Sequence, residues 1–188
     1  GKRRRATEMT LGIVGLGRIG KRMAHVSRNV FKRVVAYDPY LIDGDFPAFV
    51  ERARSLNDLF AQADVVSPHV PLNDETRGMI DAKCFAAMKR GGYIVNSSRG
   101  AVINIVDLLA ALDSGQLDSA GLDVLPVEPA RPGEALTEHP RVVLTPHSAF
   151  YSVESEIELR TKAARNLITW ANTGRPDYPV VVGTRKLP

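Results

Sequence analysis

Three glycines in the stretch GLGRIG, namely Gly15, Gly17 and Gly20, constrain the fold more than any other feature of this sequence. They follow the apolar run Leu11 to Val14, which predicts a buried strand, and they open a stretch with helical spacing, Ile19 to Asn29. Gly15 permits a tight turn, Gly17 has no side chain to obstruct a ligand, and Gly20 lets the helix pack closely on the strand. Because a helix start presents free N–H groups to an anion, the pattern predicts a βα unit that binds a pyrophosphate.

A carboxylate at the end of the next apolar run bears on the ligand. The run Val34 to Tyr37 predicts a second strand, and Asp38 follows it, 18 residues after Gly20. An acidic side chain at this place accepts hydrogen bonds from the adenosine ribose of a dinucleotide. It would repel a 2′-phosphate, and Pro39 and Tyr40 supply no arginine to hold one, so the sequence favours NAD over NADP. The alternative is that Asp38 and Pro39 only open a turn.

Short apolar runs alternate with helical stretches along the chain. The expected strands are Leu11 to Val14, Val34 to Tyr37, Val65 to Ser67, Tyr93 to Asn96, Ala120 to Val124 and Val142 to Thr145. The expected helices are Ile19 to Asn29, Leu56 to Ala63, Ala82 to Met88, Val106 to Asp113 and a long amphipathic helix, Ser152 to Asn172, stopped by Gly174 and Pro176. Several strands are apolar on both faces, as in a parallel sheet between helices. The sequence therefore predicts an α/β fold: a Rossmann-type doubly wound parallel sheet of about six strands, with helices on both faces and ligands beyond the carboxyl ends of the strands.

Charge and composition limit the other classes of partner. The formal net charge of +4 equals the four positive charges of the run Lys2 to Arg5. The other charges balance, so we expect no direct nucleic-acid binding and interpret residues 1 to 9 as a basic leader. No apolar run approaches the roughly 20 residues that span a bilayer. The single cysteine, Cys84, has neighbours that suit a small buried side chain. We therefore expect no membrane association, no metal site and a reducing, cytoplasmic compartment.

Reactive side chains follow the later strands. Arg99, Asp123 and His147 come at or just after strand ends, and Glu128 follows shortly in LDVLPVEP. Because the carboxyl ends of parallel strands meet at one edge, these four side chains could converge on one crevice. Hydride transfer between a nicotinamide ring and a carbonyl needs a cation for the substrate carboxylate, which arginine provides. It also needs an acid/base of near-neutral pKa, which a histidine beside a carboxylate provides.

The other three histidines fit the acid/base role less well. His69 ends the third expected strand in SPHVPL, where it could line the middle of the cofactor groove, and it is the main alternative to His147. His25 lies within the first helix, as a packing or surface group. His139 precedes Pro140 in a polar loop, where we expect a solvated side chain.

Six segments carry a more specific signal: LGIVGLGRIG, VVAYDPY, HVPLNDETRGMI, MKRGGYIVNSSRGAVIN, AGLDVLPVEP and LTPHSAFYS. In this order they resemble the cofactor domain of the D-isomer-specific 2-hydroxyacid dehydrogenases, over roughly residues 10 to 175. The resemblance implies an NAD-dependent oxidoreductase that interconverts small 2-hydroxy and 2-keto acids. It also implies a homodimer formed through the cofactor domain. The apolar stripe around Met23 and Val26 is compatible with such a dimer, and core packing explains the stripe equally well.

The same resemblance implies roles for individual residues. It places Arg99 on the substrate's carboxylate and carbonyl, His147 as the acid/base and Glu128 as its partner. The implied cofactor-binding residues are Gly15, Gly17, Arg18, Ile19, Gly20, Asp38, His69, Val70, Pro71, Thr76, Ser98 and Asp123. Among these, Asp123 would lie near the nicotinamide carboxamide, and the backbone of Arg18 and Ile19 would meet the pyrophosphate.

The segments YDPY and TPHSAFYSVESEIELRTKAARNL look most like the branch that contains the C-terminal-binding proteins, which are NAD-dependent corepressors, and their bacterial relatives. That branch characteristically has a tryptophan where Phe150 stands. The resemblance to this branch gives the second hypothesis, an NAD-responsive interaction module with little catalysis, which the Phe150 departure disfavours. Because the family builds its substrate domain partly from a segment before the cofactor domain, we expect the chain to be a piece of a longer protein. Residues 10 to 150 would then be the NAD-binding domain, and 151 to 188 a helix and tail that return to a substrate domain largely absent from this chain.

Overall fold

The structure is a computed structural model that describes residues 4 to 178. Its strands are β1 (Thr10–Val14), β2 (Arg33–Tyr37), β3 (Val50–Arg52), β4 (Val65–Pro68), β5 (Gly92–Asn96), β6 (Leu117–Leu122) and β7 (Val142–Leu144). Its helices are α1 (Arg18–Ser27), α2 (Leu56–Gln62), α3 (Ala82–Ala87), α4 (Ile105–Asp113), α5 (Ala135–Glu138) and α6 (Val153–Thr173), with 3-10 turns η1 (Ala6–Glu8), η2 (Asp43–Asp45) and η3 (Gly100–Val102). The chain divides into two compact units, Gly1–His147 and Ser148–Pro188.

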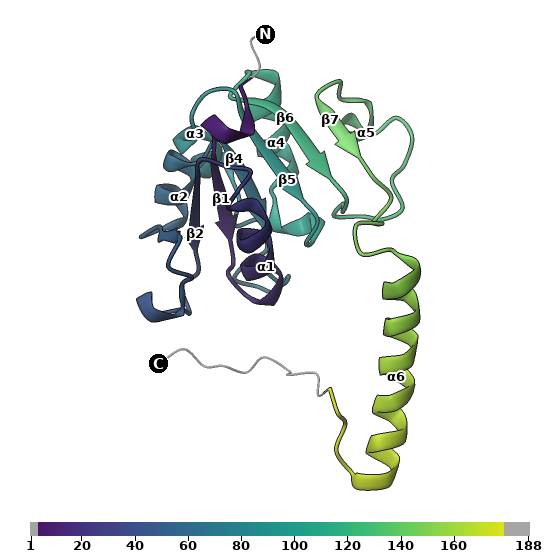
Figure 1. Cartoon of the computed structure of the whole chain (residues 1–188). Helices are drawn as coiled ribbons and strands as arrows, with labels where there is room; N and C mark the ends of the chain where they lie inside the picture. Colours follow the sequence, from purple (N-terminus) through teal and green to yellow (C-terminus); the bar gives the residue numbers. More distant parts are fainter. Residues whose placement is uncertain (1–3, 179–188) are drawn as a thin grey trace. The chain divides into compact units, whose positions relative to one another are not determined.

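The first unit is built on one parallel sheet. Its seven strands lie in the order β3-β2-β1-β4-β5-β6-β7 (Figure 1). The chain first builds outward from β1 through β2 to β3, and then returns to place β4 on the other side of β1. Loops that leave β1 and β4 therefore diverge and open a crevice at the carboxyl ends of these strands. The predicted doubly wound parallel sheet is confirmed, with one strand more than the six that the sequence indicated.

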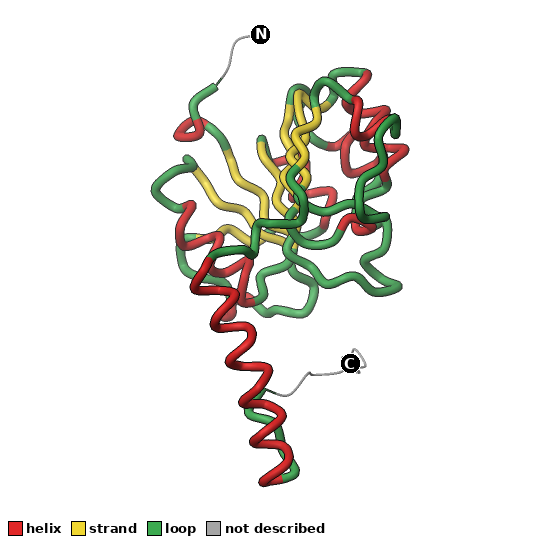
Figure 2. Tube along the Cα trace, turned by 90° about the vertical axis from the view of Figure 1, so that its right-hand side faces the viewer, coloured by secondary structure: helices red, strands yellow, loops and turns green. Residues whose placement is uncertain are grey.

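Helices cover both faces of this sheet, because side chains alternate along β1. Leu11 and Ile13 pack with Ala24 of α1 in one buried cluster. Val14 belongs to a second, larger cluster that also holds side chains of α2, α3 and α4. The strands and the helices beside them can be followed in Figure 2, in yellow and red. Each face therefore has its own hydrophobic core, as the apolar strands predicted.

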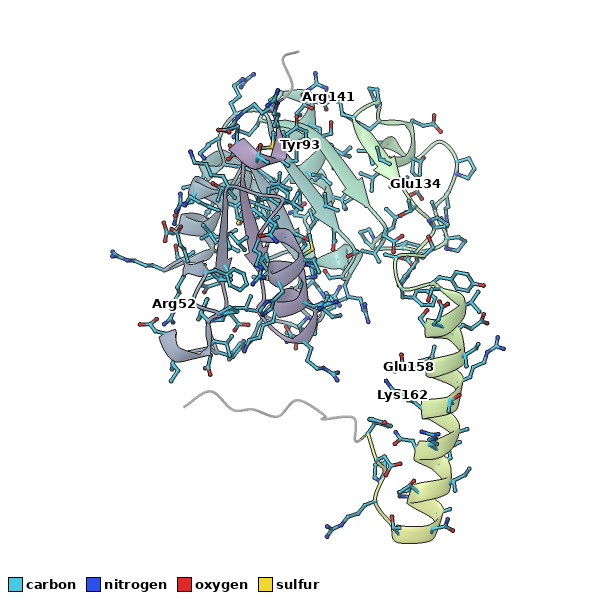
Figure 3. All side chains as sticks on the ribbon, viewed as in Figure 1. Arg52, Tyr93, Glu134, Arg141, Glu158 and Lys162 are labelled. Carbon is cyan, nitrogen blue, oxygen red and sulfur yellow. The ribbon has the colours of Figure 1, made fainter. Side chains whose placement is uncertain are left out.

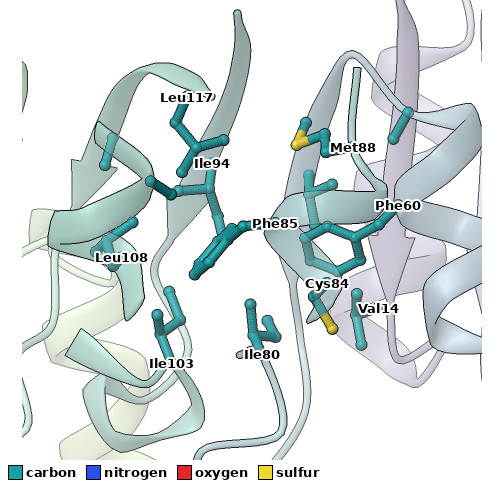
Figure 4. Close-up of a cluster of buried hydrophobic side chains, with 14 of the residues drawn as sticks. Val14, Phe60, Ile80, Cys84, Phe85, Met88, Ile94, Ile103, Leu108 and Leu117 are labelled. Atoms are coloured by element: carbon teal, nitrogen blue, oxygen red, sulfur yellow. The ribbon is translucent and has the colours of Figure 1, made fainter. Parts of the chain in front are cut away.

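The larger cluster fixes the positions of the strand ends. Phe60 of α2 and Phe85 of α3 meet edge to face with ring centroids 6.3 Å apart, and Leu108 of α4 lies among the same side chains (Figure 4). Full burial of side chains of this size stabilises the fold by about 1.5–3 kcal/mol each. Cys84 lies within the cluster, and burial raises the pKa of its thiol to about 11. The thiol is therefore a protonated packing group, which confirms the prediction of a small buried side chain.

The boundaries differ from the sequence prediction where polar residues lie in strands or where elements are short. The edge strand β3 was not predicted, since only Val50 of its three residues is buried. The four-residue helix α5 was not predicted either. Met9, which the sequence assigned to the basic leader, is buried, and Arg4 donates a hydrogen bond to Asp64. Lys2 and Arg3 lie outside the described residues.

The second unit contains α6. Ser152 caps its first turn by accepting a hydrogen bond from the Ser155 N–H, and Gly174 ends it with a φ of +71°, a left-handed conformation in which glycine is unstrained. Glu158 and Lys162 form an ion pair one turn apart (Figure 3). The described part of the unit buries no residue of α6. Among the described helices, none combines the length and apolarity needed to cross a membrane.

Candidate active site

The glycine turn after β1 has the geometry that a bound anion requires. Gly15 has a φ of +88°, and a Cβ there would lie 2.7 Å from a methyl carbon of Val70. A Cβ on Gly20 would lie 2.1 Å from the Gly15 carbonyl oxygen, so both positions exclude a side chain. A Cβ on Gly17 would meet no atom within 4 Å. The space beside Gly17 is therefore open, and α1 starts there without a side-chain cap.

Arg18 and Ile19, the first two residues of α1, bring their backbone to this open space. Both side chains are exposed to solvent, and 71% of Ile19 is accessible. The N–H groups of a first helical turn have no partner within the helix and favour negative charge. Arg18 and Ile19 therefore contribute donors through the backbone, while their side chains are left outside the turn.

Asp38 joins the end of β2 to the glycine turn. One carboxylate oxygen accepts a hydrogen bond from the Leu16 N–H at 2.9 Å, and the other accepts one from the Tyr40 N–H at 3.0 Å. The sequence did not indicate this second function of Asp38, which holds the turn in shape. Each carboxylate oxygen can accept more than one hydrogen bond, so a ribose hydroxyl can share the same oxygens.

A cavity of about 310 Å³ lies beside these residues. Its lining includes eight of the residues that the sequence singled out or placed next to the site: Gly15, Gly17, Asp38, Tyr40, His69, Val70, Pro71 and Thr76. His69 Nε2 lies 3.0 Å from the Ser67 hydroxyl, and burial lowers the pKa of His69. The Thr76 hydroxyl donates to the Pro71 carbonyl at 2.6 Å, which closes the turn after β4.

A second cavity of about 630 Å³ lies at the carboxyl ends of β6 and β7. Its lining includes Asp123, Glu128, Thr145 and His147. His147 Nδ1 lies 2.7 Å from a Glu128 carboxylate oxygen. The other Glu128 oxygen accepts a hydrogen bond from the Leu125 N–H at 2.8 Å. The carboxylate is thus held from both sides, and its position fixes the orientation of the imidazole ring.

Electrostatics support a charged partner for His147. The hydrogen bond from His147, followed by that from the Leu125 N–H, lowers the pKa of Glu128 below its ordinary value. Glu128 is therefore ionised at neutral pH. His147 also has a φ of +53°, the only positive φ among the described residues other than glycine. Its backbone is held in a sparsely populated conformation of the kind that occurs at functional sites.

The remaining candidates lie at neighbouring strand ends. Asp123 follows β6, and one of its oxygens accepts a hydrogen bond from the Thr145 hydroxyl after β7. Ser98 donates its N–H and its hydroxyl to the Asn96 side chain. Arg99 comes three residues after the end of β5, is exposed, and donates to the Ser98 carbonyl at 2.6 Å. Arg99 does not line the cavity that holds His147.

Residues 4 to 178 thus bring together three of the four predicted reactive side chains, namely Asp123, Glu128 and His147. The sequence did not single out Thr145, whose signal is its place two residues before His147. The expectation for His139 was wrong: only 11% of its side chain is exposed, because it lies 3.3 Å from an Asp113 oxygen and its Nδ1 accepts from the Arg141 N–H.

A glycine-lined anion cradle at the point where strand order reverses is the architecture of dinucleotide-dependent dehydrogenases. Comparison with known proteins defines the family within this class. The model of the D-isomer specific 2-hydroxyacid dehydrogenase NAD binding domain matches residues 2–149. The chain therefore belongs to this family, and the predicted resemblance is confirmed.

Relatives of known name are similar over most of the chain. A glyoxylate reductase from Aeropyrum pernix is 36% identical over 86% of the chain and 48% of its own length. A D-3-phosphoglycerate dehydrogenase from Bacillus subtilis is 33% identical over 86% of the chain and 31% of its own length. The chain therefore spans about half the length of the first relative and less of the second.

Solved structures agree with this assignment. A glyoxylate reductase from Paecilomyes thermophila has a TM-score of 0.85 and 33% identity, over 92% of this chain and 52% of that one. The NAD-complexed D-isomer specific 2-hydroxyacid dehydrogenase of Lactobacillus delbrueckii ssp. bulgaricus has a TM-score of 0.82 and 30% identity, over 93% of this chain and 56% of that one.

Proposed function

We propose that this chain is the cofactor-binding part of an NAD-dependent dehydrogenase that interconverts 2-hydroxy and 2-keto acids. The observation that carries the proposal is the pairing of His147 Nδ1 with Glu128 at 2.7 Å, on the wall of a cavity at the ligand-binding edge of the sheet. The names of its relatives, glyoxylate reductase and D-3-phosphoglycerate dehydrogenase, support this substrate class.

The residues around the glycine turn fit NAD. The open space at Gly17 and the uncapped start of α1 suit the pyrophosphate, and the Asp38 oxygens suit the adenosine ribose. Asp123, held by Thr145, is proposed to orient the nicotinamide carboxamide, with Ser98 close by. NAD, when bound, supplies the hydride donor and acceptor.

On this proposal His147 moves the substrate's proton. Its Nδ1–H donates to Glu128, so the proton is exchanged at Nε2. In the reduction of a keto acid, the imidazolium donates this proton to the carbonyl oxygen; in the reverse direction, neutral Nε2 accepts the hydroxyl proton. Glu128 stabilises the charged ring. Arg99 is proposed to bind the substrate carboxylate through its two-pronged guanidinium and to polarise the carbonyl.

The test is NADH oxidation by the full-length protein with a panel of 2-keto acids that includes glyoxylate and hydroxypyruvate. We expect His147→Ala to lower kcat by about 10²–10⁴-fold, the range of general acid–base catalysis. Arg99→Ala should raise KM and also lower kcat. The matched control is His25→Ala, on the exposed side of α1, which should leave turnover unchanged. Normal turnover of both site variants would disprove the assigned chemistry.

The same experiment decides between the enzyme and the interaction module. A module would bind NADH and change its state of association without oxidising NADH in the presence of any acid of the panel. The pairing of His147 with Glu128 on the wall of a cavity favours the enzyme. The homodimer is part of the proposal, and sedimentation of the full-length protein as a monomer at micromolar concentration would contradict it.

A further inference from the structure

The end of the smaller cavity is bridged by a side-chain contact that the sequence did not indicate. The Tyr40 hydroxyl donates a hydrogen bond to the Glu75 carboxylate. Tyr40 follows β2 and Glu75 lies on the turn after β4, with β1 between these strands in the sheet. The contact therefore spans the cavity above the end of β1. Both side chains line this cavity, together with Asp38 and Gly17.

Each end of the Tyr40–Glu75 bridge is anchored in the backbone. The Tyr40 N–H donates to the Asp38 carboxylate at 3.0 Å. Glu75 lies within a turn closed by two reciprocal bonds, from the Asn73 N–H to the Thr76 hydroxyl and from the Thr76 N–H to the Asn73 side chain, each 2.9 Å long. The bridge thus holds Glu75 at a fixed place even though its side chain is exposed.

The charges around this end of the cavity have one sign. Glu75, through its hydrogen bond, and also Asp38 raise the pKa of the Tyr40 phenol, so the hydroxyl remains a donor at neutral pH. The described residues that line the cavity include no lysine or arginine. A further anionic group placed here would meet two carboxylates and no lining cation.

We propose that Glu75, held across the cavity by Tyr40, is a second specificity-determining carboxylate that selects NAD against NADP. The inference rests on the proposed NAD site, with the adenosine ribose at Asp38. A 2′-phosphate on that ribose carries close to two negative charges. Asp38 faces it from the β2 side and Glu75 from the β4 side, so displacement of Asp38 alone does not relieve the repulsion.

The test compares the dissociation constants of NADH and NADPH, measured by fluorescence titration of the full-length protein. Glu75→Gln removes the charge and keeps an acceptor for Tyr40. We expect it to narrow the preference for NADH by about three- to tenfold, the size of one interaction between charges near a protein surface. Tyr40→Phe keeps the charge but frees Glu75, and should narrow the preference by a smaller factor. Both effects should decline as salt is raised.

The matched control is Asp74→Asn, which removes the same charge from the adjacent exposed residue, one that does not line the cavity. It should change the ratio less than twofold. An unchanged ratio in Glu75→Gln, or equal narrowing by Asp74→Asn, would overturn the inference and leave the proposed NAD site intact. Failure of the unmodified protein to bind NADH would instead overturn the proposed function. Equal affinity of the unmodified protein for both nucleotides would overturn the inference alone.

Discussion

The amino ends and the carboxyl ends of the parallel strands, called the amino edge and the carboxyl edge of the sheet, hold carboxylates in opposite ways. At the amino edge, Asp64 is nearly covered, with 8% of its side chain exposed, and it bonds the Thr10 N–H at 2.8 Å and Arg4 at 2.6 Å. At the carboxyl edge, Glu128 is 36% exposed, and its partner His147 lines a cavity. Asp64 is held by the Thr10 N–H and by the basic side chains of Arg4 and Lys89. Glu128 holds a side chain that can still exchange a proton.

Within one sheet, the carboxylate that stabilises the fold and the carboxylate of the proposed active site thus lie at opposite ends of the strands. The same chemistry, a carboxylate with a lowered pKa, occurs at both edges. At the amino edge burial alone would raise the pKa of Asp64, but the Thr10 N–H, Arg4 and Lys89 together outweigh it. Substitutions at the amino edge should therefore change the free energy of unfolding, and those at the carboxyl edge should change ligand binding or turnover.

The largest expected effect on NADH binding is at the carboxyl edge, in Gly17→Ala. The added methyl group meets no protein atom within 4 Å but enters the space proposed for the pyrophosphate. We expect the Kd for NADH to rise about 100-fold, or about 2.7 kcal/mol. The melting temperature should change little, because the Gly17 φ of −69° suits alanine.

Two further glycines serve as controls for this prediction. Gly44→Ala also adds a methyl group in open space, away from the cavity, and should leave both NADH binding and melting unchanged. Gly20→Ala, whose Cβ would lie 2.1 Å from a backbone oxygen, should lose stability as well as binding. If the melting temperature of Gly17→Ala is as low as that of Gly20→Ala, stability and NADH binding are not separable at this turn.

The next effect is at the amino edge, in Asp64→Ala. The variant leaves the buried N–H of Thr10 without its acceptor, so we expect the free energy of unfolding in urea to fall by about 1–3 kcal/mol. NADH affinity should be unchanged. The control is Asp43→Ala, which breaks the surface ion pair with Arg52, in which Asp43 is 88% exposed, and should lose less than about 1 kcal/mol. A large loss of NADH affinity in folded Asp64→Ala would contradict the comparison.

A smaller effect is the pH dependence that Asp64 creates. Its folded pKa lies below that of an unfolded aspartate, about 3.9, so its stabilisation is fully present above that value and is lost as pH falls through the folded pKa. The difference in unfolding free energy between the unmodified protein and Asp64→Ala should be constant from about pH 7 to 5 and shrink below about pH 4. Glu128 titrates with the same sign but is present in both proteins, so it cancels. A difference that grows on acidification would reverse the sign assigned to Asp64.

The sequence predicted the carboxyl edge better than the amino edge, because the residues of the carboxyl edge form recognisable patterns over a few consecutive positions. Backbone geometry requires glycine at Gly15 and Gly20, the open space requires it at Gly17, and all three lie within six residues; Asp38 follows directly from an apolar run. Asp64 offers no such pattern, because its partners Thr10 and Arg4 are distant in the chain and meet it only through the pairing of β1 with β4. The same holds for the Tyr40–Glu75 bridge, whose members are 35 residues apart.

Elements that the sequence missed are those in which tertiary packing outweighs local pattern. β3 shows one buried residue, Val50, and two charged ones, so its place in the sheet depends on pairing with β2. β6 begins at Leu117, earlier than the expected Ala120, because the polar residues Asp118 and Ser119 take part in the strand. Lone histidines are equally hard to place, since the Asp113 carboxylate that lies 3.3 Å from His139 belongs to α4, a different segment.

The smallest effect should come from Lys89→Met, which tests how much of the amino edge depends on charge. Lys89 is half exposed, and its ammonium lies 3.5 Å from the Asp64 carboxylate. Such a pair contributes less than about 1 kcal/mol, and less still at high salt. Lys83→Met, which removes the same charge from an exposed position on α3, is the control. A loss as large as that of Asp64→Ala would mean that the ion pair, rather than the buried bond to Thr10, stabilises this edge. A loss within the expected range would assign the stabilisation to the buried hydrogen bond between Asp64 and the Thr10 N–H. That N–H is occupied within the protein, whereas the N–H groups at the start of α1 have no side-chain cap and can bind a ligand.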